Sequence, residues 1–375
     1  MKTSTSRMLT THTGNLPRPA ELQDLVTAMG RKQRVDLTRF DEATRQSVKD
    51  VVRLQAESGV DIVNDGEHSK TSYSTYVRER LFGFEAGEFE TRPVSGDERV
   101  FRSWAGDRGP GQRAVVTEEL KWKDFSAVQK DIRNLQEAVK ESSAEEAFMT
   151  AVSPGTFCNH NGNRHYPTRE AYLSAAADVM KPEYEAVVAA GFILQLDCPD
   201  LAASRDTFYA DMTDQEFCKL AAEHIEALNY ATRDIAPDRM RIHVCWGAGG
   251  GPHKHDIELQ NIVDMLMAAR PHGLSIVAAN GRHEHEWSVW QDVKVPDGKV
   301  IIPGVIDSTA TIIEHPNTVA DRIVRFASVL GRENVIAGVD CGFRAERVDP
   351  QVIWEKLHSL SEGAAIASKS LGFGG

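Results

Sequence analysis

Short apolar runs alternate with longer amphipathic stretches along most of the chain. The runs are rich in β-branched residues and are typical of buried strands, whereas the stretches place apolar residues at helical spacing. We expect strands at 9–13, 60–64, 113–117, 147–152, 192–197, 241–245, 274–279, 300–307 and 335–340. We expect helices at 124–142, 168–191, 213–235, 255–270 and 317–331, several of which begin after Asp or Thr.

Alternating strands and helices predict an α/β fold with a parallel sheet. The number of strands favours a single (β/α)8 TIM barrel, with residues 1–375 as one catalytic domain. The candidate strands outnumber the eight barrel positions by one, and we expect 113–117 to lie outside the barrel. A doubly wound sheet is the alternative, but no glycine-rich phosphate loop follows an early strand.

One segment, 83–112, interrupts this alternation and is rich in glycine and charged residues. An insertion of this length without structure of its own is often a lid or cap over an active site. A disordered surface insertion is the other interpretation.

Composition and charge narrow the possible functions. The chain has 41% hydrophobic and 26% charged residues, as ordinary globular proteins do. Its formal net charge of −12 argues against nucleic acid or an anionic membrane as a partner. No apolar run is long enough to span a membrane, and the N-terminal residues lack the apolar core of a signal peptide. We therefore expect a cytoplasmic protein, whose five scattered cysteines are free thiols.

Polar residues stand at or just after the carboxyl ends of nearly all the predicted strands. They include His12, Thr13, Asn64, Asp65, Glu67, Ser153, Asp197, Cys198, His243, Cys245, Asn280, Asp307, Asp340 and Cys341. In a TIM barrel these ends meet at one mouth, where such enzymes place their chemistry. Polar residues are common at any strand end, so a more specific signal is needed.

The motif His243-x-Cys245 supplies that signal. Residues i and i+2 of a strand point to the same side, so the imidazole and the thiol lie together with Arg241 inside the barrel. With Cys341, at the end of another strand, they form a three-donor set that suits zinc and leaves one position open. A buried cysteine beside a hydrogen-bonded histidine is the plainer interpretation.

Two further histidine groups and one aspartate are candidates for the same chemistry. The groups are His253 and His255 in GPHKHD, and His283, Glu284 and His285 in GRHEHEW. Each group could supply a ligand or an acid, although HEHEW could equally be the solvated first turn of a helix. Asp197 could hold a substrate amine or hydroxyl, or cap the next turn.

Six motifs, in the same order, resemble the catalytic domain of cobalamin-independent methionine synthase. They are TTHTGNLPRP (10–19), VDIVNDGE (60–67), LQLDCPD (194–200), IHVC (242–245), PGVID (303–307) and VDCG (339–342). The chain is even more similar to short, single-barrel relatives, which include epoxyalkane:coenzyme M transferase. The resemblance implies a barrel with one catalytic Zn²⁺ per chain, which activates a thiol for alkylation.

The resemblance also implies roles for individual residues. His243, Cys245 and Cys341 match the zinc ligands. Gly14, Asn15, Glu67 and Asp197 match positions that bind the homocysteine backbone. Apart from the resemblance, we expect Asp307 to bind substrate as well, and we expect His12, Glu67, Asp197 and His283 to take part in catalysis.

Three positions depart from the family pattern. Asn15 replaces a serine, Val277 stands where the family has a fourth ligand, a glutamate, and Thr309 stands where it has a histidine acid. The zinc would then have three protein ligands and water, or a fourth ligand from among His253, His255, His283 and Glu284.

The function follows from the donor set. A free thiol, with a pKa of about 8.5, is mostly protonated at neutral pH, whereas a zinc-bound thiol is deprotonated. We therefore predict zinc-dependent transfer of an alkyl group, with methyl favoured, to a small thiol through a zinc-bound thiolate. Epoxide opening would also be helped by an acid, for which His12, His283 and a bound water are candidates.

Several alternatives stay open. One is addition of a thiol to an epoxide, as in epoxyalkane:coenzyme M transferase. A sulfonate on that thiol would require arginines, for which the candidates are Arg18, Arg164, Arg205 and Arg344. Another is a metal-free lyase, because the barrel also resembles uroporphyrinogen decarboxylase; a third is a binding protein without activity. A homo-oligomer is allowed but not required.

Overall fold

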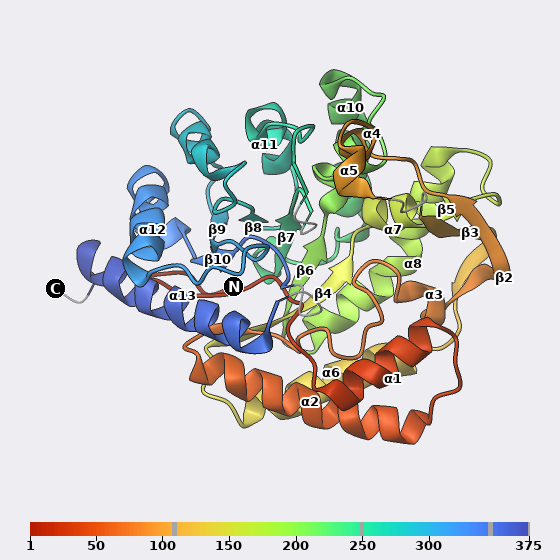
Figure 1. Ribbon diagram of the computed structural model, residues 1–375, viewed down its shortest axis with the longest axis horizontal. Coiled ribbons are helices and arrows are strands. Elements are labelled where there is room, and N and C mark those ends of the chain that lie inside the picture. Colours follow the sequence, from red (N-terminus) through yellow and green to blue (C-terminus); the bar gives the residue numbers. More distant parts are fainter. Residues whose placement is uncertain (107–110, 248–250, 344–347, 374–375) are drawn as a thin grey trace.

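A curled sheet of seven parallel strands forms most of a barrel in the computed structural model (Figure 1), which describes residues 1–106, 111–247, 251–343 and 348–373. In spatial order the strands are β1 (Ile62–Val63), β4 (Glu146–Val152), β6 (Ile193–Asp197), β7 (Met240–Val244), β8 (Gly273–Ile276), β9 (Val300–Ile306) and β10 (Gly338–Val339). All neighbours pair in parallel, as β-branched runs separated by helices predict.

The predicted first strand closes the ring between β10 and β1. Thr10 forms a parallel bridge with Ala337, and Thr11 forms one with Ile62. The backbone N–H of Thr11 donates to the carbonyl of Ala337, and that of Ile62 donates to the carbonyl of Thr10. With this eighth segment the predicted TIM barrel is confirmed.

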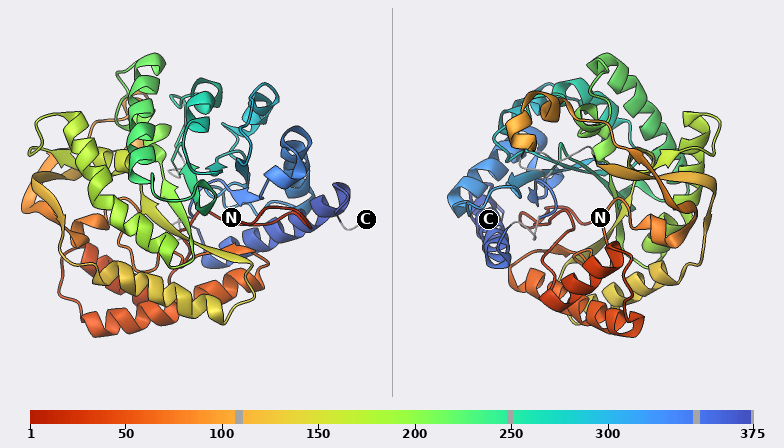
Figure 2. Two further views of the ribbon diagram at one scale, coloured as in Figure 1. Left: turned by 180° about the vertical axis from the view of Figure 1, so that it is seen from behind. Right: turned by 45° about the vertical axis from the view of Figure 1, so that its right-hand side comes forward.

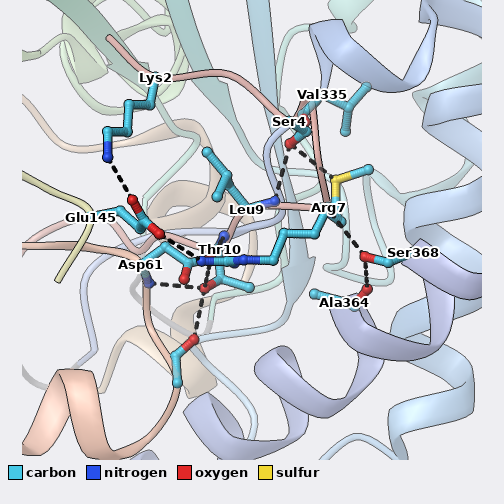
Figure 3. A network of polar contacts seen from close by, with 12 residues as sticks. Lys2, Ser4, Arg7, Leu9, Thr10, Asp61, Glu145, Val335, Ala364 and Ser368 are labelled. Carbon is cyan, nitrogen blue, oxygen red and sulfur yellow. Dashed lines mark hydrogen bonds and ion pairs between the residues drawn. The ribbon is translucent and has the colours of Figure 1, made fainter. Parts of the chain in front are cut away.

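Polar contacts fix the N-terminal segment to both of its neighbours (Figure 3). Arg7 pairs with Asp61 at 2.7 Å, and Asp61 also accepts from the backbone N–H of Thr10 at 2.8 Å. On the other side, the Ser4 hydroxyl donates to the carbonyl of Val335 at 2.6 Å. These contacts set the register of the closing segment, and therefore fix which of its residues reach the barrel mouth.

Helices alternate with the strands and surround them (Figure 2). They are α2 (Leu37–Glu57), α6 (Ser126–Lys140), α8 (Arg169–Ala189), α10 (Asp214–Ala231), α11 (Leu259–Met267), α12 (Pro316–Leu330) and α13 (Pro350–Ser370), with the 3-10 helix η3 (Glu284–Gln291) after β8. Each predicted helix is present. The N-terminus of α10 follows the predicted capping pattern, because Thr213 and Glu216 form a capping box there. Among the described residues, no helix is long and apolar enough to cross a membrane.

Short elements occupy the loops. Those at the mouth are α1 (Ala20–Gly30), α7 (Pro154–His160), η1 (Pro199–Leu201) and α9 (Ser204–Thr207), whereas η2 (Pro237–Arg239) and η4 (Arg332–Asn334) precede β7 and β10.

The insertion that follows β1 is larger and more ordered than predicted. It contains α3 (Val77–Arg80), β2 (Leu81–Thr91), α4 (Gly96–Val100), α5 (Arg102–Ala105) and β3 (Gln112–Trp122). Strand β3 pairs with β2 and with β5 (Gly162–Asn163) in a separate sheet, so 113–117 lies outside the barrel as predicted. Residues 107–110 of the predicted insertion lie outside the described residues.

The expectation of a structureless segment at 83–112 was wrong because its charges are paired across strands. Arg113 donates to Glu90 at 2.6 Å, and the two residues are register partners in β3 and β2. Opposite charges facing each other stabilise an exposed antiparallel pair. The same polar composition therefore fits a solvent-facing hairpin as well as a loop.

The barrel interior below the mouth is packed around a buried arginine. Arg241 has no exposed surface; its guanidinium donates to Gln195 at 2.8 Å and to Thr11 at 3.0 Å. It also lies over the ring of Phe148, 3.7 Å from the centroid. Arg241 and His243 both point into the barrel, as strand alternation predicted. This packed interior lies below the site, because His243 follows Arg241 two residues later on the same side of β7.

Candidate metal centre and substrate cavity

A cavity of about 700 Å³ opens at the carboxyl ends of the strands. Its lining includes His243, Cys245, Cys341, Glu67 and Asp197, all predicted from the sequence. The outer wall comes from α1, from the insertion and from the loops after β4 and β6. This is the end of the barrel at which TIM-barrel enzymes bind their substrates.

Three predicted metal ligands lie together in this cavity. His243 is in β7, beside Asp197 of β6 and Ser275 of β8 in the register. Cys245 follows β7, and Cys341 follows β10. One ligand atom from each of the three lies within 4.8 Å of the other two. The thiols, which are far apart in the sequence, meet because the strand ends converge at the mouth.

The donor set fits zinc. His243 Nε2 is buried and has no hydrogen-bond partner in the described parts of the chain, while Nδ1 lies 3.3 Å from the Ser275 hydroxyl. A ring held at one nitrogen, with the other available, is how metal-binding histidines are oriented. Two sulfurs and one imidazole are zinc ligands, and three protein ligands leave one position for a substrate. Val277 is buried and apolar, so it supplies no fourth ligand.

The two thiols influence each other's ionisation. Interaction with the Cys341 thiol, and then with the His243 ring, lowers the pKa of Cys245 well below its ordinary value. The same interaction with Cys245, together with burial, raises the pKa of Cys341. One thiolate is therefore favoured even before a metal binds, and a thiolate is the form that ligates metals.

Glu67 is held in place from several directions. Its φ of 60° is in the left-handed region. Its Oε1 accepts a hydrogen bond from the Thr150 hydroxyl at 2.8 Å. Lys70 Nζ donates to that hydroxyl oxygen at 2.9 Å, so the hydroxyl hydrogen is directed to Glu67. A Cβ on Gly14 would lie 2.9 Å from Oε1. The structure therefore places Gly14 where it makes room for Glu67.

Asp197 ends β6 on the same side of the cavity. Its Oδ1 accepts from the Gln195 side chain at 2.8 Å. Burial, and then the nearby Glu67, raise the pKa of Asp197 to about 7. Two carboxylates facing one buried space repel each other, and this repulsion is relieved when a cation binds between them.

The structure does not bring His12 to the cavity. Thr11 receives Arg241 and Thr13 lines the cavity, so alternation turns His12 to the other side of the strand. There its Nε2 lies 2.7 Å from Gln55 of α2. Burial lowers the pKa of His12 to about 3, so the ring is neutral at pH 7.

Two other predicted residues, Asp307 and His283, also lie outside the cavity lining. Asp307 follows β9 and accepts from the Thr309 hydroxyl at 2.7 Å. His283 contacts Asp256 on the neighbouring loop at 2.9 Å. Asn15, by contrast, does line the cavity.

The residues considered as a substitute fourth ligand are occupied elsewhere. His255 pairs with Asp97 at 2.6 Å, and Glu284 pairs with Arg322 at 3.2 Å. His253 and His283 belong to a separate cluster, described below. In the described part of the chain, none of them joins the His243 group.

The arginines predicted to bind a sulfonate differ in whether they line the cavity. Arg18 lines the cavity and donates to the backbone carbonyl of Glu67 at 2.7 Å. Arg164 and Arg205 pair with acidic residues outside the lining. Arg344 lies outside the described residues. Arg92, contributed by the insertion, lines the cavity and was not predicted.

Sequence reasoning also missed an aromatic wall and the support of Glu67. The ring of His160 packs edge-on against Tyr73 and Phe208, at 5.9 and 5.4 Å. These side chains come from different loops, and no local pattern joins them. Lys70, however, follows Glu67 within the same DGEHSK turn, which was a usable signal.

Comparison with known proteins places this geometry in context. No family model matches the chain. A methionine synthase of Sulfolobus acidocaldarius is 24% identical over 364 residues, which cover 96% of this chain and 93% of the relative. A 2-hydroxypropyl-CoM lyase of Xanthobacter autotrophicus is 23% identical over 395 residues, covering 96% and 95%.

Solved structures agree on the fold. The structure of a B12-independent methionine synthase from Shewanella sp. W3-18-1 in complex with selenomethionine matches with a TM-score of 0.73 and 20% identity, covering 97% of this chain and 99% of that one. A putative B12-independent methionine synthase from Listeria monocytogenes gives 0.68 and 16%, covering 98% of each chain. The resemblance predicted from the motifs is thereby confirmed: over nearly its whole length this chain is similar in sequence to methionine synthases and to 2-hydroxypropyl-CoM lyase, and it shares the barrel of B12-independent methionine synthases.

Proposed function

We propose that this protein is an enzyme that transfers an alkyl group, with methyl favoured, to a small thiol, and that His243, Cys245 and Cys341 hold a zinc ion for this purpose. The observation that carries the proposal is that all three donors line the same cavity as Glu67 and Asp197. The relatives named methionine synthase and 2-hydroxypropyl-CoM lyase support chemistry at sulfur.

Different parts of the chain position the three metal ligands. Ser275 orients His243, and the converging ends of β7 and β10 bring the two thiols to it. When bound, zinc supplies a Lewis acid that keeps a thiol ionised at neutral pH.

The two carboxylates favour a thiol that carries an amine. A bound ammonium between Glu67 and Asp197 would relieve the repulsion that raises the pKa of Asp197. Charge-assisted hydrogen bonds from the ammonium would orient the thiol toward His243 and the two cysteines. An amino thiol such as homocysteine is therefore the acceptor that this half of the cavity fits best.

A second candidate is addition of a sulfonate-bearing thiol to an epoxide. Arg18 and Arg92 line the cavity and could meet an anionic group there, although Arg92 also pairs with Glu98 at 2.8 Å. The two candidates require opposite charges on the thiol, so acceptor charge separates them. A cytoplasmic location and a homo-oligomer remain predictions.

The test offers the purified protein homocysteine and 2-mercaptoethanesulfonate in parallel, each with a panel of methyl donors and epoxides. Products are identified by mass spectrometry, and Cys245→Ala is the inactive control. We expect alkylated homocysteine with the wild-type protein only. Alkylated sulfonate thiol would favour the second candidate. Product formed equally well by Cys245→Ala would refute both.

A further inference from the structure

A second group of metal-binding side chains lies on the two loops that follow β7 and β8. His253 and Asp256 come from the first loop, and His283 comes from the second. One ligand atom of each lies within 4.8 Å of the other two. His253 Nδ1 and His283 Nε2 lie 2.7 and 2.9 Å from the same oxygen, Asp256 Oδ2. None of the three lines the cavity that contains His243.

The group is buried and its central ring is rigidly oriented. The side chains of Asp256 and His283 are 5% and 3% exposed. Glu286 accepts from His283 Nδ1 at 2.8 Å through one oxygen, and from the backbone N–H of Leu259 at 2.6 Å through the other. The ring of Trp246 lies against His283, with centroids 4.4 Å apart. A carboxylate behind the far nitrogen is the arrangement that orients metal-binding histidines.

His253 carries two further signs of a built site. Its φ of 54° is in the left-handed region, which a non-glycine residue keeps only where its surroundings impose it. Its Nε2 is buried and has no hydrogen-bond partner among the described residues. That nitrogen can therefore carry the ring proton whenever Nδ1 gives up its own.

We propose that His253, Asp256 and His283 bind a second divalent transition-metal ion, separate from the zinc centre. Two imidazoles and one carboxylate suit Zn²⁺, Co²⁺, Mn²⁺ or Fe²⁺, and three protein ligands leave at least one position open. With metal–ligand bonds of about 2.1 Å, tetrahedral donors stand about 3.4 Å apart. The two short contacts to Asp256 would need to open by only about 0.6 Å.

Proton balance is compatible with binding. The proton between His283 Nε2 and Asp256 leaves, while Nδ1 keeps its proton on Glu286. On His253 the proton leaves Nδ1 and Nε2 is the protonated nitrogen. The ion would then tie the loop that begins beside Cys245 to the loop that contains η3. This inference does not depend on the proposed alkyl transfer.

The experiment titrates the metal-free, full-length protein with Co²⁺. Bound cobalt is counted by equilibrium dialysis and elemental analysis, and the absorption spectrum is recorded. Cobalt ligated by cysteine shows thiolate-to-metal charge transfer, whereas a site with only nitrogen and oxygen ligands does not. The variants are His283→Gln and Cys245→Ala. The matched control is His285→Gln, because His285 lies two residues after His283, in η3, and its side chain is 63% exposed.

We expect two equivalents of cobalt in the wild type and in His285→Gln. His283→Gln should keep the charge-transfer band and lose one equivalent, whereas Cys245→Ala should lose the band and keep the other equivalent. A single equivalent in the wild type that carries the thiolate band and is unchanged in His283→Gln would overturn the proposal. A second equivalent that persists in His283→Gln and disappears in His285→Gln would also overturn it.

A second variant guards against misfolding. If His283→Gln loses its circular dichroism signature, Asp256→Asn replaces it, because this change keeps the shape and removes the charged ligand. The same loss of one equivalent is expected, and full retention would overturn the proposal. Absence of the charge-transfer band in the wild type, with the other equivalent present, would contradict the zinc centre and leave this site supported.

Discussion

Replacing Thr150 by valine removes the hydroxyl that joins Lys70 to Glu67. That hydroxyl accepts from Lys70 Nζ at 2.9 Å and donates to Glu67 Oε1 at 2.8 Å. A hydrogen bond to a charged group contributes roughly 1.5–3 kcal/mol. Water that enters from the cavity would replace part of it, so we expect a loss near the lower limit. A loss of about 1.4 kcal/mol corresponds to about a tenfold lower affinity for a cation bound by Glu67.

The assay compares an amino thiol with a thiol of the same length that lacks the amine. Thr150→Val should raise the KM for the amino thiol by about tenfold and leave the KM for the amine-free thiol within about twofold. Thr150→Ser keeps the hydroxyl and should behave like the wild type. Equal losses for both thiols, or equal losses in Thr150→Ser and Thr150→Val, would refute the idea that this hydroxyl positions Glu67 for an amine.

Three further predictions follow from the same geometry. In Gly14→Ala the new Cβ would stand 2.9 Å from Glu67 Oε1 on a backbone with a φ of 146°, so we expect activity to fall at least tenfold and the free energy of unfolding to fall by about 1–3 kcal/mol, measured by urea unfolding. Burial lowers the pKa of His12 and of His68 to about 3. Because the unfolded chain binds these protons near pH 6.5 and the folded chain does not, each histidine should cost the folded state about 2 kcal/mol at pH 5. The buried Asp197, whose pKa is raised to about 7, has the opposite effect, so the wild type is compared with His12→Gln and His68→Gln; a variant whose urea midpoint changes with pH as the wild type's does would contradict neutral burial. Val277→Glu places a carboxylate where the family pattern has its fourth ligand, and should slow zinc loss to a chelator; unchanged release kinetics would mean that residue 277 does not reach the metal.

The barrel could be predicted because its strands are buried on both faces. Such strands appear as continuous apolar runs, and the helices between them keep a clear period. The insertion could not be predicted in the same way, because the pairing of Glu90 with Arg113 depends on which strands become neighbours. Composition alone does not distinguish a charged hairpin from a charged loop.

The candidate site was predictable where it depends on strand geometry. Alternation placed Arg241 and His243 inside the barrel, and convergence of the strand ends brought in Cys341. The same alternation turns His12 away from the cavity, because the closing segment directs Thr11 and Thr13 inward.

Contacts between distant segments lay beyond sequence reasoning. Thr150 is an ordinary residue in the middle of an apolar strand, and only the fold places its hydroxyl between Lys70 and Glu67. Likewise, the motif HEHEW was equally compatible with the solvated start of a helix. Its first histidine, His283, contacts Asp256 on another loop, and no pattern in the sequence connects the two residues.

The zinc site at His243, Cys245 and Cys341 is tested by measuring the zinc content of purified wild-type protein and of Cys245→Ala by elemental analysis, with Cys218→Ala as a control on α10, outside the cavity lining. We predict that Cys245→Ala contains one zinc per chain fewer than the wild type and that Cys218→Ala loses none. Wild-type protein without zinc when purified in the absence of chelator, or the same zinc content in Cys245→Ala as in the wild type, would contradict it.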